Sequence, residues 1–230
     1  MSESKRAAGR RAAEFIESGQ TVGLGTGSTV FFTLERLAER IRDEGLEIRG
    51  VPTSIDTETK SRGFGIPLAT LDEVEKIDVT VDGADEIDGA FQMIKGGGGA
   101  LLREKVVASL SDRVVIVVGA DKVVERLGST FDLPVEVVPF ARAVVHRRIE
   151  AMGGQPALRM RKDDSSAAYL TDNGNEILDV HHADGIADAA ALERALHEIP
   201  GVVESGLFIG LAHAMVVGEA DGSASVHERG

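Results

Sequence analysis

The chain contains 230 residues, of which 43% are hydrophobic and 27% are charged; this ordinary globular composition excludes a disordered chain or a long array of domains. The 25 basic and 38 acidic residues give a net charge of −13, which repels nucleic-acid backbones and predicts no nucleic-acid partner. The chain has no cysteine, so disulfide scaffolds, thiolate zinc sites and cysteine nucleophiles are also excluded.

In the first half of the chain, short apolar runs alternate with helical patterns, which is typical of βαβ units around a parallel sheet. In chain order, the predicted elements are a helix over 3–18, a strand over 21–24, a helix over 30–44, a strand over 48–51, a helix over 54–63, strands over 68–70 and 77–81, a helix over 101–110 and a strand over 114–118. The last of these is a continuous apolar run, as expected of a strand buried on both faces.

From about Phe131 the pattern changes to short strands with two helices, which indicates an α+β unit. The predicted elements here are strands over 135–138, 156–160, 168–171 and 177–180 and helices over 141–152 and 187–198. A last strand is expected over 207–217, and the polar residues 219–230 are expected to be disordered.

We therefore predict an α/β protein with two domains. A Rossmann-like parallel-sheet domain is expected to comprise residues 1–130 and 206–230, and a smaller α+β, ferredoxin-like domain residues 131–205. No run approaches the ~20 apolar residues that cross a bilayer, and the N-terminus lacks the apolar core of a signal peptide. We expect a cytoplasmic protein with no membrane partner.

The pair Asn173-Gly174 lies between two strand-like runs and predicts a type I′ hairpin turn, in which both residues have positive φ. A calcium loop is the alternative interpretation of TDNGNEILD, but the spacing of its oxygen-bearing side chains does not fit an EF-hand. We favour the turn.

Three segments follow predicted strands, at the edge where open α/β sheets bind ligands. The first is Gly23-Leu24-Gly25-Thr26-Gly27-Ser28-Thr29, which joins a strand to a helix. Its glycines allow backbone N–H groups to approach an anion, and its hydroxyl groups add donors, so we predict a phosphate cradle. It matches neither a P-loop nor a dinucleotide-binding fingerprint. The structural alternative is a tight turn capped by Ser28.

The second segment is Asp82-Gly83-Ala84-Asp85-Glu86-Ile87-Asp88-Gly89, directly after an apolar run. Clustered carboxylates at a strand end serve as metal ligands, acceptors for sugar hydroxyls or acid/base groups. Gly83 permits a sharp exit from the strand, so that Asp82 and Asp85 can converge. A solvated acidic turn is the alternative in so acidic a chain.

The third segment is Lys95-Gly96-Gly97-Gly98-Gly99-Ala100, followed by a helix that contains Glu104. Four consecutive glycines lose much conformational entropy on folding, which suggests backbone N–H groups exposed for a ligand. With Lys95 before them and Glu104 after them, a cation, N–H donors and a carboxylate can surround one space. The alternative is a flexible loop.

The segments GLGTGST, DGADEID and KGGGGALLREK, in this order and at these separations, resemble those of the type A ribose-5-phosphate isomerases. The resemblance continues through ADKVVERLG, LPVEVVPFA, GGQPALR, TDNGNEILD and IPGVVESGLF, and covers about residues 3 to 218. It implies interconversion of D-ribose 5-phosphate and D-ribulose 5-phosphate through an enediolate, in the non-oxidative pentose phosphate pathway. It also implies no metal or organic cofactor, and a homodimer or homotetramer.

The resemblance further implies roles for individual residues. Glu104 corresponds to the proton acceptor, and Asp82, Asp85 and Lys95 to the groups that handle the O1 and O2 hydroxyls. The implied substrate contacts come from the three segments and one later lysine: Thr26, Gly27, Ser28, Thr29, Asp82, Gly83, Ala84, Asp85, Lys95, Gly96, Gly97, Gly98 and Lys122. Lys5 is a further candidate for a phosphate contact. The chemistry agrees, because one carboxylate can serve both proton transfers on one face of a planar enediolate.

Three other classes are kept as alternatives. A non-catalytic sugar-phosphate sensor would bind its ligand without converting it, but no helix-turn-helix segment precedes residue 20. A coenzyme A transferase would form a glutamyl thioester with acyl-CoA. A nicotinamide-dependent enzyme would change the fluorescence of its cofactor, although the fingerprint for that cofactor is missing.

Lysine is scarce, since it accounts for only seven of the 25 basic residues, and the acidic residues are spread along the whole chain. This composition resembles that of proteins from salt-loving organisms. Strong salt screens the repulsion between acidic side chains, so we expect a halophilic protein whose stability rises with salt concentration.

Overall fold

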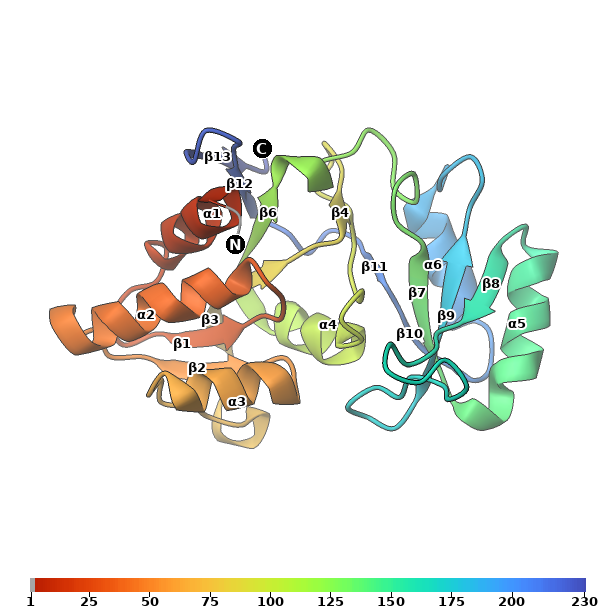
Figure 1. Ribbon diagram of the computed structural model, residues 1–230, viewed down its shortest axis with the longest axis horizontal. Helices are drawn as coiled ribbons and strands as arrows, with labels where there is room; N and C mark the ends of the chain where they lie inside the picture. The colour runs from red at the N-terminus through yellow and green to blue at the C-terminus, as the bar shows by residue number, and fades with distance from the viewer. Residues whose placement is uncertain (1–2) are drawn as a thin grey trace. The chain divides into compact units, whose positions relative to one another are not determined.

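A six-stranded sheet forms the centre of the first of two units (Figure 1). The computed structural model describes residues 3–230, and unit 1 comprises Met1–Ala84, Arg103–Val123 and Leu211–Gly230. The strands, in spatial order, are β13 (Ala224–Glu228), β12 (Ala214–Gly218), β6 (Ser111–Gly119), β3 (Ile77–Gly83), β1 (Thr21–Leu24) and β2 (Arg49–Pro52). Neighbouring strands are parallel except for β12 and β13.

The order of the strands reverses between β1 and β3. The chain runs from β1 outward to β2 and then returns to the other side of β1 to form β3. Open α/β sheets bind ligands beyond the carboxyl ends of the strands at such a switch point. Leu24 and Val81 are paired in the register of β1 and β3, so the segments that follow these two residues are brought together.

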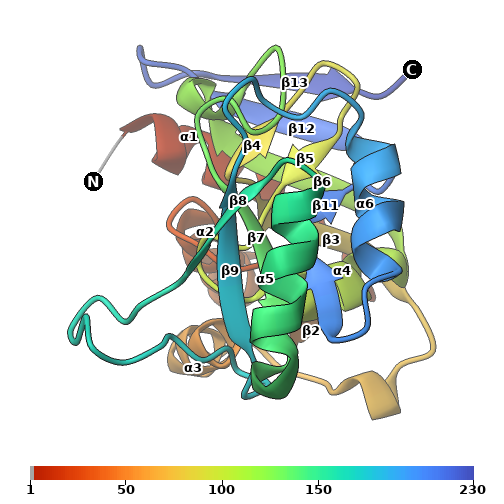
Figure 2. The same cartoon turned by 90° about the vertical axis from the view of Figure 1, so that its right-hand side faces the viewer.

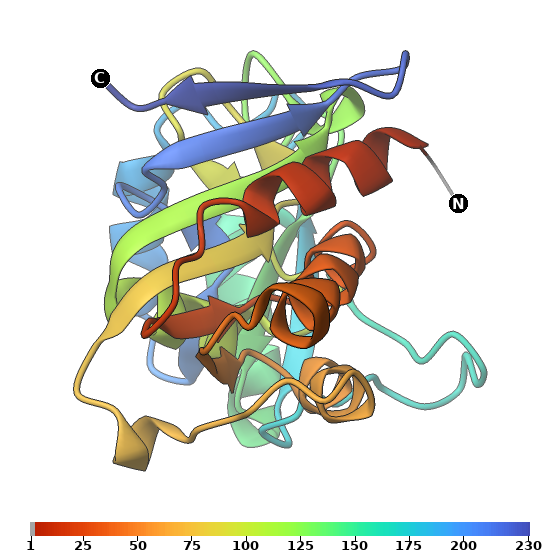
Figure 3. The same cartoon turned by 90° about the vertical axis from the view of Figure 1, so that its left-hand side faces the viewer.

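Helices cover both faces of this sheet. Those of unit 1 are α1 (Glu3–Ala13), α2 (Val30–Glu44), α3 (Ile55–Gly63) and α4 (Leu101–Ser109), whose first two residues belong to unit 2. α1 and α2 lie over one face of the sheet (Figure 3). Val22 and Leu24 of β1 pack with these two helices in a buried core. Gly23 faces the opposite side, where a Cβ atom would collide with Val107 of α4. The alternation along β1 thus places one helix layer on each face.

Unit 2 comprises Asp85–Leu102 and Val124–Gly210. Its antiparallel sheet has the order β10 (Val202–Ser205), β7 (Leu133–Val137), β9 (Glu176–His181) and β8 (Gln155–Leu158). With α5 (Arg142–Ala151) and α6 (Ala189–His197), which lie over one face of this sheet (Figure 2), the chain order is βαββαβ. This is the ferredoxin-like arrangement, so the predicted α/β fold with a smaller α+β domain is confirmed.

Residues 85–102 lie in unit 2 because they join a small three-stranded sheet. That sheet consists of β4 (Glu86–Ile87), β5 (Met93–Ile94) and β11 (Leu207–Phe208). The two units therefore differ from the predicted division into residues 1–130 with 206–230 and residues 131–205. The pairing of Ile94 with Leu207 joins segments that are far apart in the sequence. Residues 3–230 also contain three short 3-10 helices: η1 (Leu71–Glu73), η2 (Ala120–Lys122) and η3 (Pro139–Ala141).

Several predicted elements are corrected by the structure. Residues 68–70 and 168–171 form only isolated bridges, with Gly50 and Met160 as the partner residues. The helix predicted over 3–18 ends at Ala13. The strand predicted over 207–217 is interrupted: β11 belongs to unit 2 and β12 to unit 1, and Gly210 between them has a φ of 73°.

The polar residues after 218 are ordered, which contradicts the prediction of a disordered tail. They form β13, which pairs with β12 from Ala224 opposite Gly218 to Glu228 opposite Ala214. An edge strand needs only one apolar side, and here Ala224 and Val226 pack against the core of unit 1. The exposed side of the strand can be polar, so composition alone does not reveal it.

The turn at Asn173-Gly174 is not of type I′. Of the two residues, only Gly174 has a positive φ, 78°. The side chains of Asn173 and Asn175 instead donate hydrogen bonds to Oε1 of Glu136, at 3.1 Å and 2.9 Å. Among residues 3–230, no helix is long and apolar enough to span a membrane.

Candidate active site

Asp82 lies against the loop that follows β1. The backbone N–H of Thr26 donates to Oδ1 of Asp82 at 3.0 Å, and the N–H of Gly83 donates to the same oxygen at 2.7 Å. Gly25 is required here, because a Cβ atom at that position would collide with Asp82. The first two segments thus meet at the switch point between β1 and β3, in unit 1. Gly83 and Ala84 follow as half-buried backbone positions.

The hydroxyl of Thr26 belongs to a cluster that sequence reasoning missed. Its Oγ1 lies 2.8 Å from Oγ1 of Thr53, 2.8 Å from Oγ of Ser54 and 3.1 Å from Oγ1 of Thr57. The Thr57 hydroxyl donates to the carbonyl of Gly25 at 2.9 Å. Hydroxyls that follow β2 therefore fix the loop that follows β1. The signal was present in the sequence, because β2 neighbours β1 and its carboxyl end must lie beside this loop.

Ser28 contacts a lysine of α1. Nζ of Lys5 donates to Oγ of Ser28 at 3.0 Å. Thr29, and not Ser28, is the N-cap of α2, and no hydrogen bond from the Thr29 side chain caps the helix. Gly27 precedes them with a φ of 128°. An ammonium group, a hydroxyl and the start of a long helix gather around this loop, which suits an anion.

The four acids of the second segment have different partners. Asp85, in unit 2, accepts a hydrogen bond from the N–H of Gly97 at 2.7 Å. Glu86 is fully buried and accepts three hydrogen bonds from residues 128–130, and Asp88 accepts two from its own loop. Glu86 and Asp88 therefore stabilise loops, whereas Asp82 and Asp85 each hold a glycine-containing segment.

Lys95 is buried in unit 2, with 3% of its surface exposed. Its backbone N–H donates to the carbonyl of Gly206 at 2.9 Å, and its Nζ lies 5.4 Å from the centroid of the Phe208 ring. A desolvated ammonium over an aromatic ring is held in place by a cation–π contact. Gly96–Gly99 continue from this lysine as a turn, in which the N–H of Gly99 donates to the carbonyl of Gly96 at 2.9 Å.

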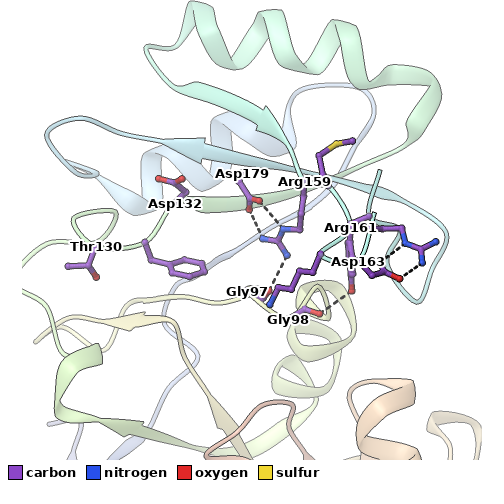
Figure 4. Close-up of a pocket in the computed structure, with 12 residues that line it drawn as sticks. Gly97, Gly98, Thr130, Asp132, Arg159, Arg161, Asp163 and Asp179 are labelled. Carbon is purple, nitrogen blue, oxygen red and sulfur yellow. Dashed lines mark hydrogen bonds and ion pairs between the residues drawn. The ribbon is translucent and has the colours of Figure 1, made fainter. Parts of the chain in front are cut away.

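A cavity of about 830 Å³ borders the glycine segment in unit 2 (Figure 4). Gly97 and Gly98 line it, together with Phe131, Arg159 and Tyr169. Sequence reasoning did not single out these three side chains. Arg159 lies within the quoted segment GGQPALR, but nothing local indicates that it reaches the glycines, since β8 and the glycine segment meet only in the folded unit.

Glu104 and Lys122 lie in unit 1. Glu104 is in the first turn of α4 and is 5% exposed. Lys122 ends η2, directly after β6, and is half-buried. β6 is the parallel neighbour of β3, so Lys122 follows the same sheet edge as Asp82. Within the described part of the chain, no group of three or more histidine, cysteine or acidic side chains could hold a metal ion.

These features define the class of the protein: an α/β enzyme with carboxylates, hydroxyls and lysines at a topological switch point, as expected for a small polar ligand. The sequence profile described as ribose 5-phosphate isomerase A (phosphoriboisomerase A) matches residues 49–222. The ribose-5-phosphate isomerase A of Thermosynechococcus vestitus is 49% identical, over 99% of this chain and 97% of that protein. The corresponding protein of Listeria innocua is 49% identical, over 98% of this chain and 99% of that one.

Solved structures agree with the sequence comparisons. Ribose 5-phosphate isomerase A from Methanocaldococcus jannaschii has a TM-score of 0.92 and 37% identity, over 98% of both chains. A D-ribose-5-phosphate isomerase in complex with phospho-erythronic acid has a TM-score of 0.94 and 35% identity, over 99% of this chain and 98% of that one.

The chain belongs to the ribose 5-phosphate isomerase A family and is an aldose–ketose isomerase that acts on ribose 5-phosphate. The resemblance inferred from GLGTGST, DGADEID and KGGGGALLREK is confirmed.

Proposed function

We propose that this protein interconverts D-ribose 5-phosphate and D-ribulose 5-phosphate through an enediolate, with Glu104 as the base, in the non-oxidative pentose phosphate pathway. Glu104 removes the C2 proton of the open-chain aldose, and the electron pair forms a C1–C2 double bond while O1 becomes negative. The proton of the O2 hydroxyl moves to O1, and Glu104 returns its proton to C1, which yields the ketose. The reaction conserves all atoms and requires no metal or organic cofactor.

The burial of Glu104 carries this proposal. The residue is only 5% exposed and lies in the first turn of the helix that follows the glycine segment. Exclusion of water leaves fewer competing partners for the proton and strengthens electrostatic interactions with the substrate.

Asp82, Asp85 and Lys95 handle the O1 and O2 oxygens. The backbone N–H groups of Thr26 and Gly97 fix the two carboxylates at 3.0 Å and 2.7 Å. The buried ammonium of Lys95 stabilises the negative charge that develops on the enediolate oxygen, because little water screens it. A related isomerase has been solved in complex with phospho-erythronic acid. The carboxylate of that acid presents two oxygens in one plane, as an enediolate does, which supports the proposed enediolate.

The remaining proposed contacts bind the substrate. Thr26, Gly27, Ser28 and Thr29 form the loop for the phosphate group, and the proximity of Lys5 to Ser28 at 3.0 Å supports this choice. Lys122 contributes a further positive charge, and Gly83, Ala84 and Gly96–Gly98 offer backbone groups. Positive charge close to the ligand offsets the net charge of −13 at short range.

The assay that tests the proposal follows ribulose 5-phosphate formation from ribose 5-phosphate in high-salt buffer with EDTA. We expect wild type to turn over and Glu104→Gln to lose at least ~10²-fold in kcat, as is typical for loss of a general base. Glu47→Gln is the matched control, because Glu47 is an exposed carboxylate of unit 1. Retention of wild-type kcat by a folded Glu104→Gln variant would exclude Glu104 as the base.

We also propose that the protein acts in the cytoplasm as a homodimer or homotetramer, without a nucleic-acid or membrane partner. The Phe140 side chain supports self-association, because it is 99% exposed and Val144 beside it is 47% exposed. Burial of a phenylalanine side chain contributes roughly 1.5–3 kcal/mol. Light scattering on the purified protein is expected to give the mass of two or four chains, and the mass of a single chain would contradict the proposal.

A further inference from the structure

Side chains of unit 2 hold the carbonyl groups of three consecutive glycines, Gly96, Gly97 and Gly98, of which Figure 4 shows the last two. Nη1 of Arg159 donates to the carbonyl oxygen of Gly96 at 2.9 Å and to that of Gly97 at 3.3 Å. The hydroxyl of Tyr169 donates to the carbonyl oxygen of Gly98 at 3.1 Å. Arg159 and Tyr169 are themselves joined, since the backbone N–H of Tyr169 donates to the carbonyl of Arg159 at 2.9 Å.

The guanidinium of Arg159 is fixed by a carboxylate. Its Nε lies 2.9 Å from Oδ2 of Asp179 and its Nη2 lies 2.5 Å from Oδ1, which makes a two-bond ion pair with β9. The Arg159 side chain is only 15% exposed. Because a guanidinium is planar and its N–H groups have fixed directions, this pairing determines where the remaining Nη1 group points. It points at the glycine segment.

One peptide group connects Arg159 to Asp85. The carbonyl of Gly96 and the N–H of Gly97 belong to the same planar trans peptide and therefore point in opposite directions. Arg159 binds the carbonyl end, and Oδ2 of Asp85 accepts from the N–H end at 2.7 Å. A positive charge on the carbonyl polarises the peptide and makes its N–H a stronger donor. Asp179, Arg159, this peptide and Asp85 thus form a continuous chain of hydrogen bonds.

The glycines make such support necessary. Residues without Cβ atoms have the largest choice of backbone conformations, so the segment has little tendency of its own to hold one. The Gly97 N–H binds the Asp85 carboxylate, so the position of this carboxylate is fixed only as well as the position of that N–H.

We propose that Arg159 is a positioning residue for the isomerisation: through the Gly96–Gly97 peptide it sets the orientation of the Asp85 carboxylate, and Tyr169 holds the next carbonyl of the segment. The proposal rests on the proposed role of Asp85 in handling the substrate hydroxyls. Arg159 acts through Asp85 and is assigned no contact with the substrate.

The first test is Arg159→Met, which keeps most of the side-chain stem and removes the guanidinium. We expect kcat to fall by about 10- to 100-fold, because a small misplacement of a reacting group has an effect of this order, with KM changed by less than about threefold. Arg159→Lys, which keeps a cation near the carbonyls, is expected to recover part of kcat. Tyr169→Phe, which removes only one hydroxyl, is expected to lower kcat by less than Arg159→Met.

Arg161→Met is the matched control. Arg161 makes a two-bond ion pair with Asp163, at 3.0 Å and 2.7 Å, and so has the geometry of the Arg159–Asp179 pair without the bond to the glycine carbonyls. We expect wild-type kcat for this variant. An equal fall in kcat for both arginine variants would show that loss of either arginine–aspartate ion pair is enough to lower kcat. That result would overturn the proposal.

A double-mutant cycle with Asp85→Asn separates positioning from general stabilisation of unit 2. If Arg159 acts through Asp85, Arg159→Met lowers the residual kcat of Asp85→Asn by less than about twofold, because interacting sites are not additive. Multiplicative effects of the two substitutions would overturn the proposal. Circular dichroism and the unfolding midpoint establish that each variant is folded, and Arg159→Lys replaces Arg159→Met in the cycle if the latter does not fold.

The same assays distinguish failure of this inference from failure of the proposed function. Absence of ribulose 5-phosphate formation by wild type would overturn the proposed function itself. Conversion by wild type, loss of activity in Asp85→Asn and full activity in Arg159→Met would overturn only the positioning role of Arg159. Full activity of Asp85→Asn would overturn the role of Asp85 and, with it, that of Arg159.

Discussion

Asp82, Asp85 and Glu86 show how neighbouring carboxylates acquire different partners. The two aspartates each accept a hydrogen bond from the backbone of a distant glycine-containing segment, Asp82 from Thr26 and Asp85 from Gly97. The nearby Glu86 is also a carboxylate, yet it is fully buried and holds residues 128–130. The chain order of these acids does not distinguish them. What separates them is which segment the fold brings to each oxygen.

Tyr169 provides a spectroscopic probe for the glycine segment. It is the only tyrosine in a chain without tryptophan, so phenolate absorbance in the near ultraviolet reports this residue alone. Burial of the ring raises the pKa of Tyr169 above its ordinary value of 10.0, and the negative charge of Asp172 adds to the effect while Arg159 opposes it. We expect a higher titration midpoint in the native protein than in the chain unfolded by denaturant.

The stability that Tyr169 contributes has a defined pH dependence. Because the folded pKa is the higher one, this contribution is fully present below pH 10.0 and is lost as the pH rises from there through the folded pKa. Tyr169→Phe is therefore expected to unfold with a weaker pH dependence in that alkaline window. Equal titration midpoints in the folded and unfolded chains would contradict the prediction.

At the scale of elements, β1 is the strand that positions the site, and it is packed on both faces. The Val22 and Leu24 side chains enter the core under α1 and α2, whereas Gly23 faces Thr80 of β3 and Val107 of α4. β1 can approach α4 this closely only because residue 23 has no Cβ atom. The loop that begins at Gly25 directly follows β1, so this close packing of β1 also determines where the loop starts.

Gly23→Ala is expected to destabilise the protein. A Cβ atom there would overlap the Thr80 hydroxyl and come within 2.7 Å of Val107, and overpacking of this kind costs about 1–3 kcal/mol. Urea unfolding measures the effect. The control is Gly63→Ala at the end of α3, where an added Cβ meets nothing within 4 Å and we expect no loss of stability. A similar unfolding midpoint for both variants would refute the close packing of β1 against α4.

Regular periodicity determined which elements could be predicted. The strand over 21–24 and the helix over 30–44 match β1 and α2, because each has a clear apolar pattern. β4 and β5 have two residues each and are too short to show a period, and β10 was also missed. Likewise, the three segments of the candidate site are visible in the sequence, and the hydroxyls of Thr53 and Ser54 could have been placed beside the first segment because they follow β2. The Arg159 contacts, in contrast, arise only from tertiary structure.

At the scale of the whole molecule, the excess of acidic residues dominates the surface electrostatics. Ion pairs such as Arg10–Glu39 and Arg36–Glu44 neutralise individual carboxylates locally, but exposed pairs contribute only about 0–1 kcal/mol each. The net charge of −13 remains, and its self-repulsion opposes the folded state when little salt is present.

We expect the melting temperature to rise between low and molar salt. The Debye length falls from ~30 Å at 0.01 M to ~3 Å at 1 M, so molar salt screens repulsion between separated carboxylates. Calorimetry in potassium chloride measures the change. Sucrose, at concentrations of matched osmolality, is the control for general exclusion from the protein surface. A melting temperature that does not change with salt would contradict halophilic stabilisation.

The strand order of unit 1 also has a consequence for the nascent chain on the ribosome. β12 pairs with β6, yet the whole of Val124–Gly210 is translated between them. The βαββαβ part of unit 2 can therefore complete its sheet while β6 still has an unpaired edge. Exposed strand edges promote association with other chains, so this interval of synthesis is the time at which the protein most needs protection from aggregation.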